Sequence, residues 1–335
     1  MLAQEGRAAS AGSPSVFSLA GVALTLRSDD PDLVDVLASV LGAPSDHPAA
    51  SGISVEVHSR SGDPFGFLRF DGLAPADLTA DDLLLGLESP EFPFRVVAAN
   101  ATRTSFAFGD DLEPLLELRG AECRFRKAAD WRVAVALLLH HRLMRARRDA
   151  IFFHAASVGI AGRGVLFVGP KGAGKSTTAL ALSARGHAFF GDETAAWLPA
   201  SGEIIAVRRP VGIKPGPRAT AVEAGLARTG RSPERDGILR LDVGALLTAP
   251  EPAPAALRAI VFLSGFVPLP RLTRVVPGRD ELAQLQPSVA SLVNAPRAQR
   301  VFELARMLSS AAVYRLSPGE PDATAACVEE VIAGQ

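Results

Sequence analysis

The chain of 335 residues is long enough for two ordinary domains, and its 48% hydrophobic and 21% charged residues are the balance of a folded globular protein. Its formal net charge of -1 argues against general binding to nucleic acid or to an anionic membrane. The two cysteines have no paired spacing, and no apolar run approaches the roughly 20 residues that span a bilayer, so we expect a cytoplasmic protein.

The first part of the chain predicts a small α+β domain behind a flexible leader. Residues 1–13 are small, polar and rich in glycine and serine, which is typical of a loose terminus. Asp30-Pro31-Asp32 predicts the start of a helix. We expect this domain to occupy residues 14–128, where no recognisable chemistry occurs. Its strand candidates are 16–26, 53–57, 66–70, 94–98, 104–108 and 115–119.

The remaining residues, 129–335, predict an α/β domain. Asp130 is the expected cap of a long helix that joins the two domains. After residue 150, strands alternate with helices, which is the pattern of an α/β fold. The predicted strands are 151–158, 165–168, 187–190, 259–263 and 313–316, and the predicted helices are 175–185, 288–293, 297–308 and a last one capped by Asp322.

One eight-residue motif fits a phosphate-binding loop, which we call the P-loop (residues 169–176). It matches GxxxxGK[ST], where backbone N–H groups wrap phosphates, Lys175 reaches the β and γ oxygens, and the Ser176 hydroxyl holds magnesium. An apolar strand precedes it and a helix follows, so the positive helix N-terminus faces the anion. We therefore predict binding of ATP, or another nucleoside triphosphate, with Mg²⁺. The predicted binding residues are Gly169, Pro170, Lys171, Gly172, Ala173, Gly174, Lys175, Ser176 and Thr177.

The strand after the P-loop helix ends in two acids, Asp192 and Glu193. Strands beside a P-loop deliver their C-terminal residues to the γ-phosphate side of the nucleotide. One carboxylate could orient or deprotonate an acceptor hydroxyl and the other could bind magnesium. The sequence alone does not decide which does which. The apolar strand at 259–263 runs into Ser264-Gly265 without an acid, so the pair is the best-placed carboxylate group.

From these motifs the chain resembles the HPr kinase/phosphorylase-like kinases, and specifically the HPr-kinase-related proteins often found beside peptide-modifying enzymes. The resemblance covers about residues 131–331. It is carried by four blocks of sequence: His154-Ala155-Ala156-Ser157, the P-loop, Arg185-Gly186-His187 followed by Gly191-Asp192-Glu193, and Arg209-Pro210-Val211-Gly212-Ile213-Lys214.

The resemblance implies a P-loop kinase core related to that of the PEP carboxykinases, with the smaller α+β domain before it. It implies that His154 lies near the transferred phosphate, that Asp192 is the general base, and that Glu193 stands where the family usually has a second Asp. Arg209 and Lys214 could clamp phosphates. A homo-oligomer would be ordinary for the family. The glycine-rich signature associated with phosphorolysis is not visible between residues 217 and 257, so HPr is not the predicted substrate.

Three functions remain open at this stage. The leading one is an ATP-dependent kinase acting on a Ser or Thr hydroxyl of a peptide or protein, for example the precursor of a ribosomal peptide natural product. The second is a small-molecule hydroxyl kinase of the shikimate or gluconate type, which is normally a compact single domain. The third is a nucleotide-binding regulatory or scaffold protein without turnover, although Lys175, Ser176, Asp192 and Glu193 are all present.

Overall fold

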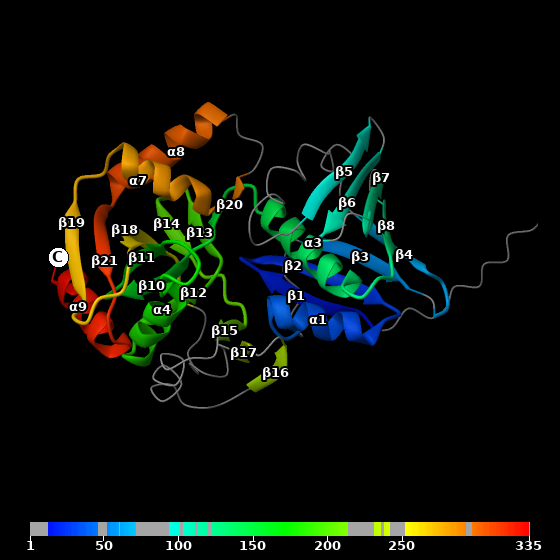
Figure 1. The fold of residues 1–335 in the computed structure, drawn as a ribbon, viewed down its shortest axis with the longest axis horizontal. Coiled ribbons are helices and arrows are strands. Elements are labelled where there is room, and N and C mark those ends of the chain that lie inside the picture. The colour runs from blue at the N-terminus through cyan, green and yellow to red at the C-terminus, as the bar shows by residue number, and fades with distance from the viewer. Residues whose placement is uncertain are drawn as a thin grey trace, which may run out of the picture. The chain divides into compact units, whose positions relative to one another are not determined.

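The fold divides into two compact units, residues 1–146 and 147–335 (Figure 1). The computed structural model describes residues 13–45, 52–59, 61–71, 94–100, 103–110, 113–119, 122–213, 231–235, 238–241, 252–292 and 297–334. The long helix α3 (Trp131–Ala146) belongs to the first unit, whereas the sequence places the domain boundary before it. The reason is long-range packing, because α3 lies against helix α1 (Pro31–Leu41).

The first unit is built on one sheet. Its strands are β1 (Ser15–Leu19), β2 (Val22–Ser28), β3 (Gly52–His58), β4 (Phe65–Asp71), β5 (Phe94–Asn100), β6 (Arg103–Phe108), β7 (Leu116–Arg119) and β8 (Glu122–Arg126). Their order among the described residues is β1-β2-β3-β4-β8-β7-β6-β5. The region 16–26 forms a hairpin, with Ala20 and Gly21 at positive φ in the turn. Strands with helices α1 and α3 make this unit α+β, as predicted.

The second unit contains a larger sheet and a small one. The strands of the larger sheet are β9 (Ile151–Phe153), β10 (Ala156–Ile160), β11 (Arg163–Val168), β12 (Ala188–Gly191), β13 (Ala195–Leu198), β14 (Glu203–Ile205), β18 (Ala255–Leu263), β19 (Arg271–Val275), β20 (Val289–Leu292) and β21 (Ala312–Ser317). Their order among the described residues is β12-β10-β11-β18-β14-β13-β9-β20, with β21 beside β18 and β19 beside β21. The small sheet contains β15 (Val211–Ile213), β17 (Ile238–Leu241) and β16 (Arg231–Arg235), in that order.

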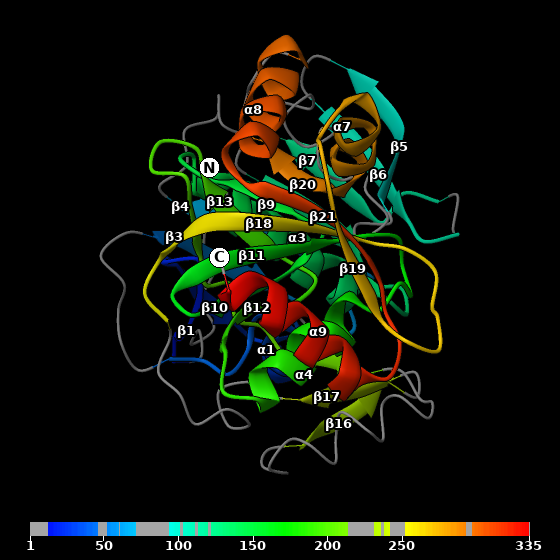
Figure 2. The same ribbon diagram turned by 90° about the vertical axis from the view of Figure 1, so that its left-hand side faces the viewer.

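Helices cover both faces of the larger sheet. They are α4 (Lys175–Ala184), α7 (Arg279–Leu285), η2 (Gln286–Ser288), α8 (Arg297–Ser310) and α9 (Pro321–Ala333). Figure 2 shows α4 and α9 side by side on one face, and α7 and α8 on the other. Strand β11 serves both faces, because Val165 and Phe167 lie in the core under α4 and α9, whereas Leu166 and Val168 lie in the core under α7 and α8.

Besides the domain boundary, two predicted elements differ from this fold. The predicted strand at 151–158 is interrupted at His154 and Ala155, so that β9 and β10 pair with different neighbours. The predicted helix at 288–293 is wrong, because Val289–Leu292 is strand β20, which pairs antiparallel with β9. In both places pairing between distant segments outweighs the local pattern. In the described part of the chain, no helix combines the length and apolar character needed to cross a membrane.

Candidate functional site

Several loops of the second unit meet at one edge of the larger sheet. Strand β10 runs antiparallel to both β11 and β12, with Ala156 opposite Phe167 and Ser157 opposite Gly191. The start of β10 therefore lies beside the C-terminal ends of β11 and β12. Strand β18 runs parallel to β11, so its C-terminal end reaches the same edge. The turn before β10, the P-loop after β11, the acidic turn after β12 and the loop after β18 are thus neighbours.

The P-loop lies between β11 and α4, in the strand–loop–helix order that the sequence predicts. Gly172 and Gly174 have φ values of 83° and 99°, a left-handed conformation that glycine adopts without a Cβ penalty. Gly174 is the N-cap of α4, and it has no side chain that could accept hydrogen bonds from the backbone N–H groups of the first turn. Such a helix start favours an anion. Lys171 and Gly172 are exposed at the loop tip.

Lys175 is folded back over this loop. Its side chain is buried, and its Nζ donates hydrogen bonds to the carbonyl oxygens of Gly169 at 2.8 Å and Pro170 at 3.2 Å. A buried ammonium needs such acceptors to offset its lost hydration. Ser176 and Thr177 follow in the first turn of α4, and both are half-buried. The ammonium group and the helix start therefore place positive charge within the P-loop.

Asp192 lies at the end of β12 with only 4% of its surface exposed. Burial, and then the negative charge of Glu193, raise its pKa to about 6, although the Ser176 hydroxyl, the Glu193 backbone and Lys175 act in the opposite direction. Neither carboxylate oxygen accepts a hydrogen bond of standard geometry from the described residues. Because a buried carboxylate without such bonds is costly, this group suits a bound cation or a hydroxyl donor.

The next residue, Glu193, has a different environment from Asp192. It is exposed, and its φ of 59° is uncommon for a residue with a side chain and costs about 1 kcal/mol. The two adjacent carboxylates therefore differ in exposure, because Asp192 is buried and Glu193 is exposed. Strain of this kind is frequent at functional sites.

The donor set fits a magnesium ion that is shared with a nucleotide. Mg²⁺ is usually held by one or two carboxylates together with substrate phosphates and waters. The hydroxyl of Ser176 and the carboxylates of Asp192 and Glu193 are donors of that kind beside the P-loop. Within the described residues, no group of three His, Cys, Asp or Glu side chains could hold a metal by itself. Coordination by Ser176 and Glu193 stays a prediction.

A second segment brings Arg209 to the acidic turn. Gly191 forms a parallel bridge with Val207, and a Cβ on Gly191 would lie 2.6 Å from the Val207 carbonyl oxygen, so this close approach requires glycine. Two residues later, Arg209 donates a hydrogen bond of 2.7 Å from Nη1 to the Oγ1 of Thr194, which is fully buried. Arg209 therefore contacts the residue that follows Glu193 in the sequence. Lys214, its predicted companion, lies outside the described residues.

His154 occupies the turn between β9 and β10, at the same edge. It is half-buried, and its backbone N–H donates a hydrogen bond to the carbonyl of Ser288. Three residues later, Ser157 is fully buried, and its hydroxyl has no hydrogen-bond partner among the described residues. The structure therefore brings His154 to the site region, whereas a role for it at the transferred phosphate stays a prediction.

The sequence motifs indicate no role for the loop after β18. Here the Oγ atoms of Ser264 and Ser317 lie 2.9 Å apart, and the ring of Phe266 lies against Gly174 of the P-loop. The first contact joins the ends of β18 and β21, and the second joins the loop after β18 to the P-loop, both across large sequence separations. No local motif indicates them.

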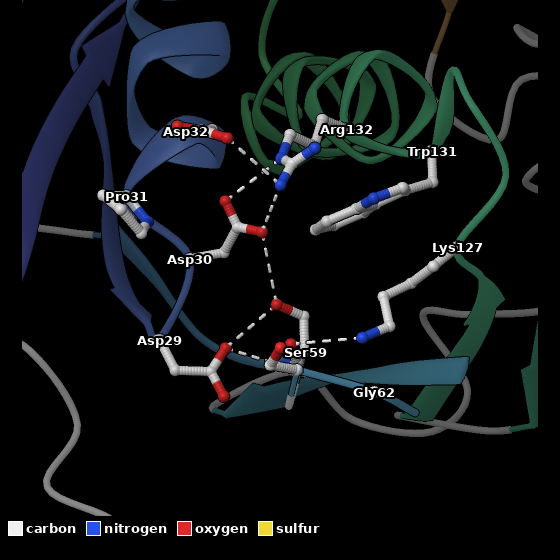
Figure 3. A pocket seen from close by; sticks show the side chains of 10 residues that line it. Asp29, Asp30, Pro31, Asp32, Ser59, Gly62, Lys127, Trp131 and Arg132 are labelled. Carbon is white, nitrogen blue, oxygen red and sulfur yellow. Dashed lines mark hydrogen bonds and ion pairs between the residues drawn. The ribbon is translucent and has the colours of Figure 1, made fainter. Parts of the chain in front are cut away.

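The first unit contains a separate pocket of ≈ 410 Å³, formed by α1, α3 and the end of β3 (Figure 3). Its charged groups largely bind one another. Arg132 donates hydrogen bonds of 3.0 and 2.8 Å to the two carboxylate oxygens of Asp30, and it forms an ion pair with Asp32. Burial opposes ionisation of Asp30, but Arg132, the Leu33 backbone and Ser59 hold its pKa below the ordinary value. These contacts of Arg132 join helix α3 to the start of helix α1, and we assign the pocket no ligand.

Neither the scan against protein-family models nor the search of curated proteins found a match. Among solved structures, the HPr(Ser) kinase/phosphatase from Coxiella burnetii matches over 55% of this chain and 97% of that one, at 16% sequence identity and a TM-score of 0.28. A likeness at that level carries no argument about activity.

The fold and the site define a mixed α/β protein with two large sheets, the second of which carries a P-loop beside a buried carboxylate. The HPr-kinase-like family, and the PEP-carboxykinase-type core that it implies, stay predictions from the sequence motifs.

Proposed function

We propose that the protein is an ATP-dependent kinase that transfers the γ-phosphate to a Ser or Thr hydroxyl of a peptide or protein. The observation that carries this proposal is Asp192, a buried carboxylate whose pKa is raised to about 6 beside the P-loop residues Lys175 and Ser176. Active sites are where burial and like charges shift pKa values in this way. A pKa near neutrality suits a general base.

The chain's own residues supply binding and positioning. The backbone N–H groups of the P-loop would hold the phosphates, and Lys175 would exchange its carbonyl partners for the β and γ oxygens. Ser176 and Glu193 would hold Mg²⁺, which neutralises charge on the phosphates when it is bound. His154 and Arg209 lie in the turns around this edge and could contact the γ-phosphate, together with Lys214.

The proposed reaction is a direct transfer. Asp192 accepts the proton of the acceptor hydroxyl while the hydroxyl oxygen forms a bond to the γ-phosphorus. The bond between that phosphorus and the β–γ bridging oxygen breaks, and ADP leaves with the bonding electron pair. The products are a phosphomonoester, ADP and a protonated Asp192, which returns its proton to water. Positioning and charge stabilisation are expected to supply most of the rate enhancement.

A peptide or protein acceptor is favoured over a metabolite by two features. The chain carries an additional unit with its own sheet and its own buried apolar residues, whereas small-molecule kinases are normally compact single domains. The sequence motifs also resemble those of kinases associated with peptide tailoring. A peptide acceptor, a cytoplasmic location and a homo-oligomeric state are parts of this proposal, as are the absence of nucleic-acid and membrane partners.

The test is phosphate transfer to a defined acceptor. The full-length protein is incubated with Mg²⁺-ATP and peptides encoded beside its gene, with HPr and a panel of sugars and hydroxy acids in parallel. We expect one added phosphate on a Ser or Thr side chain of a peptide, localised by fragmentation in a mass spectrometer, and unmodified HPr. Transfer only to a free sugar or hydroxy acid would establish the small-molecule kinase instead. Tight nucleotide binding without any transfer would favour the regulatory or scaffold function.

A further inference from the structure

The loop at residues 264–270 follows β18 and lies on the far side of β11 from Asp192. In the sheet order β12-β10-β11-β18, Asp192 follows β12 two strands to one side of the P-loop strand, and this loop follows β18 on the other. The loop is anchored, because the backbone N–H of Ser264 donates to the Leu316 carbonyl at 2.8 Å and that of Val267 donates to the Pro318 carbonyl at 2.9 Å. These two bonds hold the loop against the end of β21.

Phe266 is the aromatic residue of this loop, and it lies on the P-loop itself. A Cβ placed on Gly174 would lie 3.3 Å from Cε1 and 3.4 Å from Cζ of Phe266, so the ring packs directly on the glycine that caps α4. The side chain is nevertheless 41% exposed. Phe266 is thus partly exposed next to the expected phosphate site.

We propose that Phe266 is a nucleobase-stacking residue of this protein, and that it binds a nucleoside triphosphate through the flat face of its base. This inference rests on the proposed function. If the γ-phosphate faces Asp192, the nucleoside lies on the other side of the P-loop, where the loop that carries Phe266 follows β18. Every nucleobase offers a π-face, and stacking on an aromatic side chain tolerates changes of base. Phe266 therefore contributes affinity for both ATP and GTP.

Replacing Phe266 should lower the affinity only for ligands that contain a nucleobase. Binding of Mg²⁺-ATP, Mg²⁺-GTP and Mg²⁺-tripolyphosphate to the full-length protein is measured by calorimetry. Phe266→Ala should weaken ATP and GTP by roughly 5- to 100-fold, the range of base–aromatic stacking, and change tripolyphosphate binding by less than about twofold. Leu269→Ala is the matched control, because it removes a side chain that is 81% exposed from the same loop. It should leave all three affinities unchanged.

The fluorescence of a Phe266→Trp variant provides a second measurement, which does not depend on removing the ring that packs on Gly174. In Phe266→Trp, ATP should change the fluorescence of the new indole, whereas tripolyphosphate should not. Equal weakening of all three ligands by Phe266→Ala would show that the ring only supports the P-loop, and undiminished ATP affinity would place the base elsewhere. Either result overturns the stacking role while leaving the kinase proposal intact. A wild-type protein that binds neither ATP nor tripolyphosphate would overturn both proposals.

Discussion

Asp192→Asn is expected to stabilise the nucleotide-free protein at pH 8. Asp192 is fully buried, and its pKa is raised from the ordinary 3.8 to about 6. Each unit of pKa difference between folded and unfolded states corresponds to about 1.4 kcal/mol, so ionisation of this one carboxylate costs the folded state about 3 kcal/mol. Asparagine has nearly the same shape and stays neutral, and it avoids that cost.

The gain in stability from Asp192→Asn should depend on pH. A group whose pKa is raised in the folded state contributes stability that is fully present below its unfolded pKa and is lost as the pH rises through its folded pKa. This contribution of Asp192 should therefore be lost from the wild-type protein between pH 4 and pH 7, whereas Asp192→Asn has no such contribution to lose. The difference between the two proteins should be small at pH 4 and should reach about 3 kcal/mol at pH 8.

The measurement is urea unfolding followed by the fluorescence of Trp197, which is buried in the second unit. The chain has two tryptophans, and Trp131 lies in the first unit, so both proteins carry Trp131→Phe to isolate the signal. Glu330→Gln, at an exposed carboxylate of α9, is the control and should give no such gain. A gain that is the same at pH 4 and pH 8, or a loss at pH 8, would show that ionisation of Asp192 does not destabilise the folded protein.

Three further outcomes are expected. Lys175→Ala should stay folded but bind Mg²⁺-ATP roughly 10- to 100-fold more weakly by calorimetry, because it loses a charge-assisted contact with the phosphates; unchanged affinity would remove Lys175 from the site. The rate of phosphate transfer should fall about tenfold per pH unit below pH 6, since only ionised Asp192 accepts a proton, and Asp192→Asn should be roughly 10²- to 10⁴-fold slower while still binding ATP. Asp30→Asn should destabilise the first unit by about 1 kcal/mol at pH 7, because it keeps the helix cap but weakens the Arg132 pair. Because the Asp30 pKa is lowered, this difference should vanish as the pH falls through that pKa. Trp131 fluorescence would report it in a Trp197→Phe background, and the exposed Asp32→Asn should have little effect.

The sequence predicts best the features that depend on neighbours along the chain. The P-loop, the apolar strand before it and the helix after it have strict local requirements, and the structure has them in that order at β11 and α4. The position of Asp192 at the end of the next strand follows from the same alternation of strands and helices. The burial of Asp192 does not, because it depends on what packs over the acidic turn.

Features that depend on distant segments escaped prediction or were predicted wrongly. Val289–Leu292 forms a strand because β9 offers it a pairing edge, although its residues alone suggested a helix. Helix α3 belongs to the first unit because α1 packs on it. The contact of Phe266 with Gly174 joins residues more than 90 positions apart, and no spacing rule encodes it.

The two carboxylates of the acidic turn can be given different roles on physical grounds, which the sequence alone left open. Adjacent residues share one sequence environment, but Glu193, which has a left-handed backbone conformation, is exposed, whereas Asp192 is buried. A buried carboxylate with a raised pKa binds a proton more readily than a solvated one, and environments that separate two titratable groups also separate the proton-accepting role from the charge-stabilising role. Asp192 is therefore the better candidate for the base, and Glu193 for a ligand of a hydrated magnesium ion.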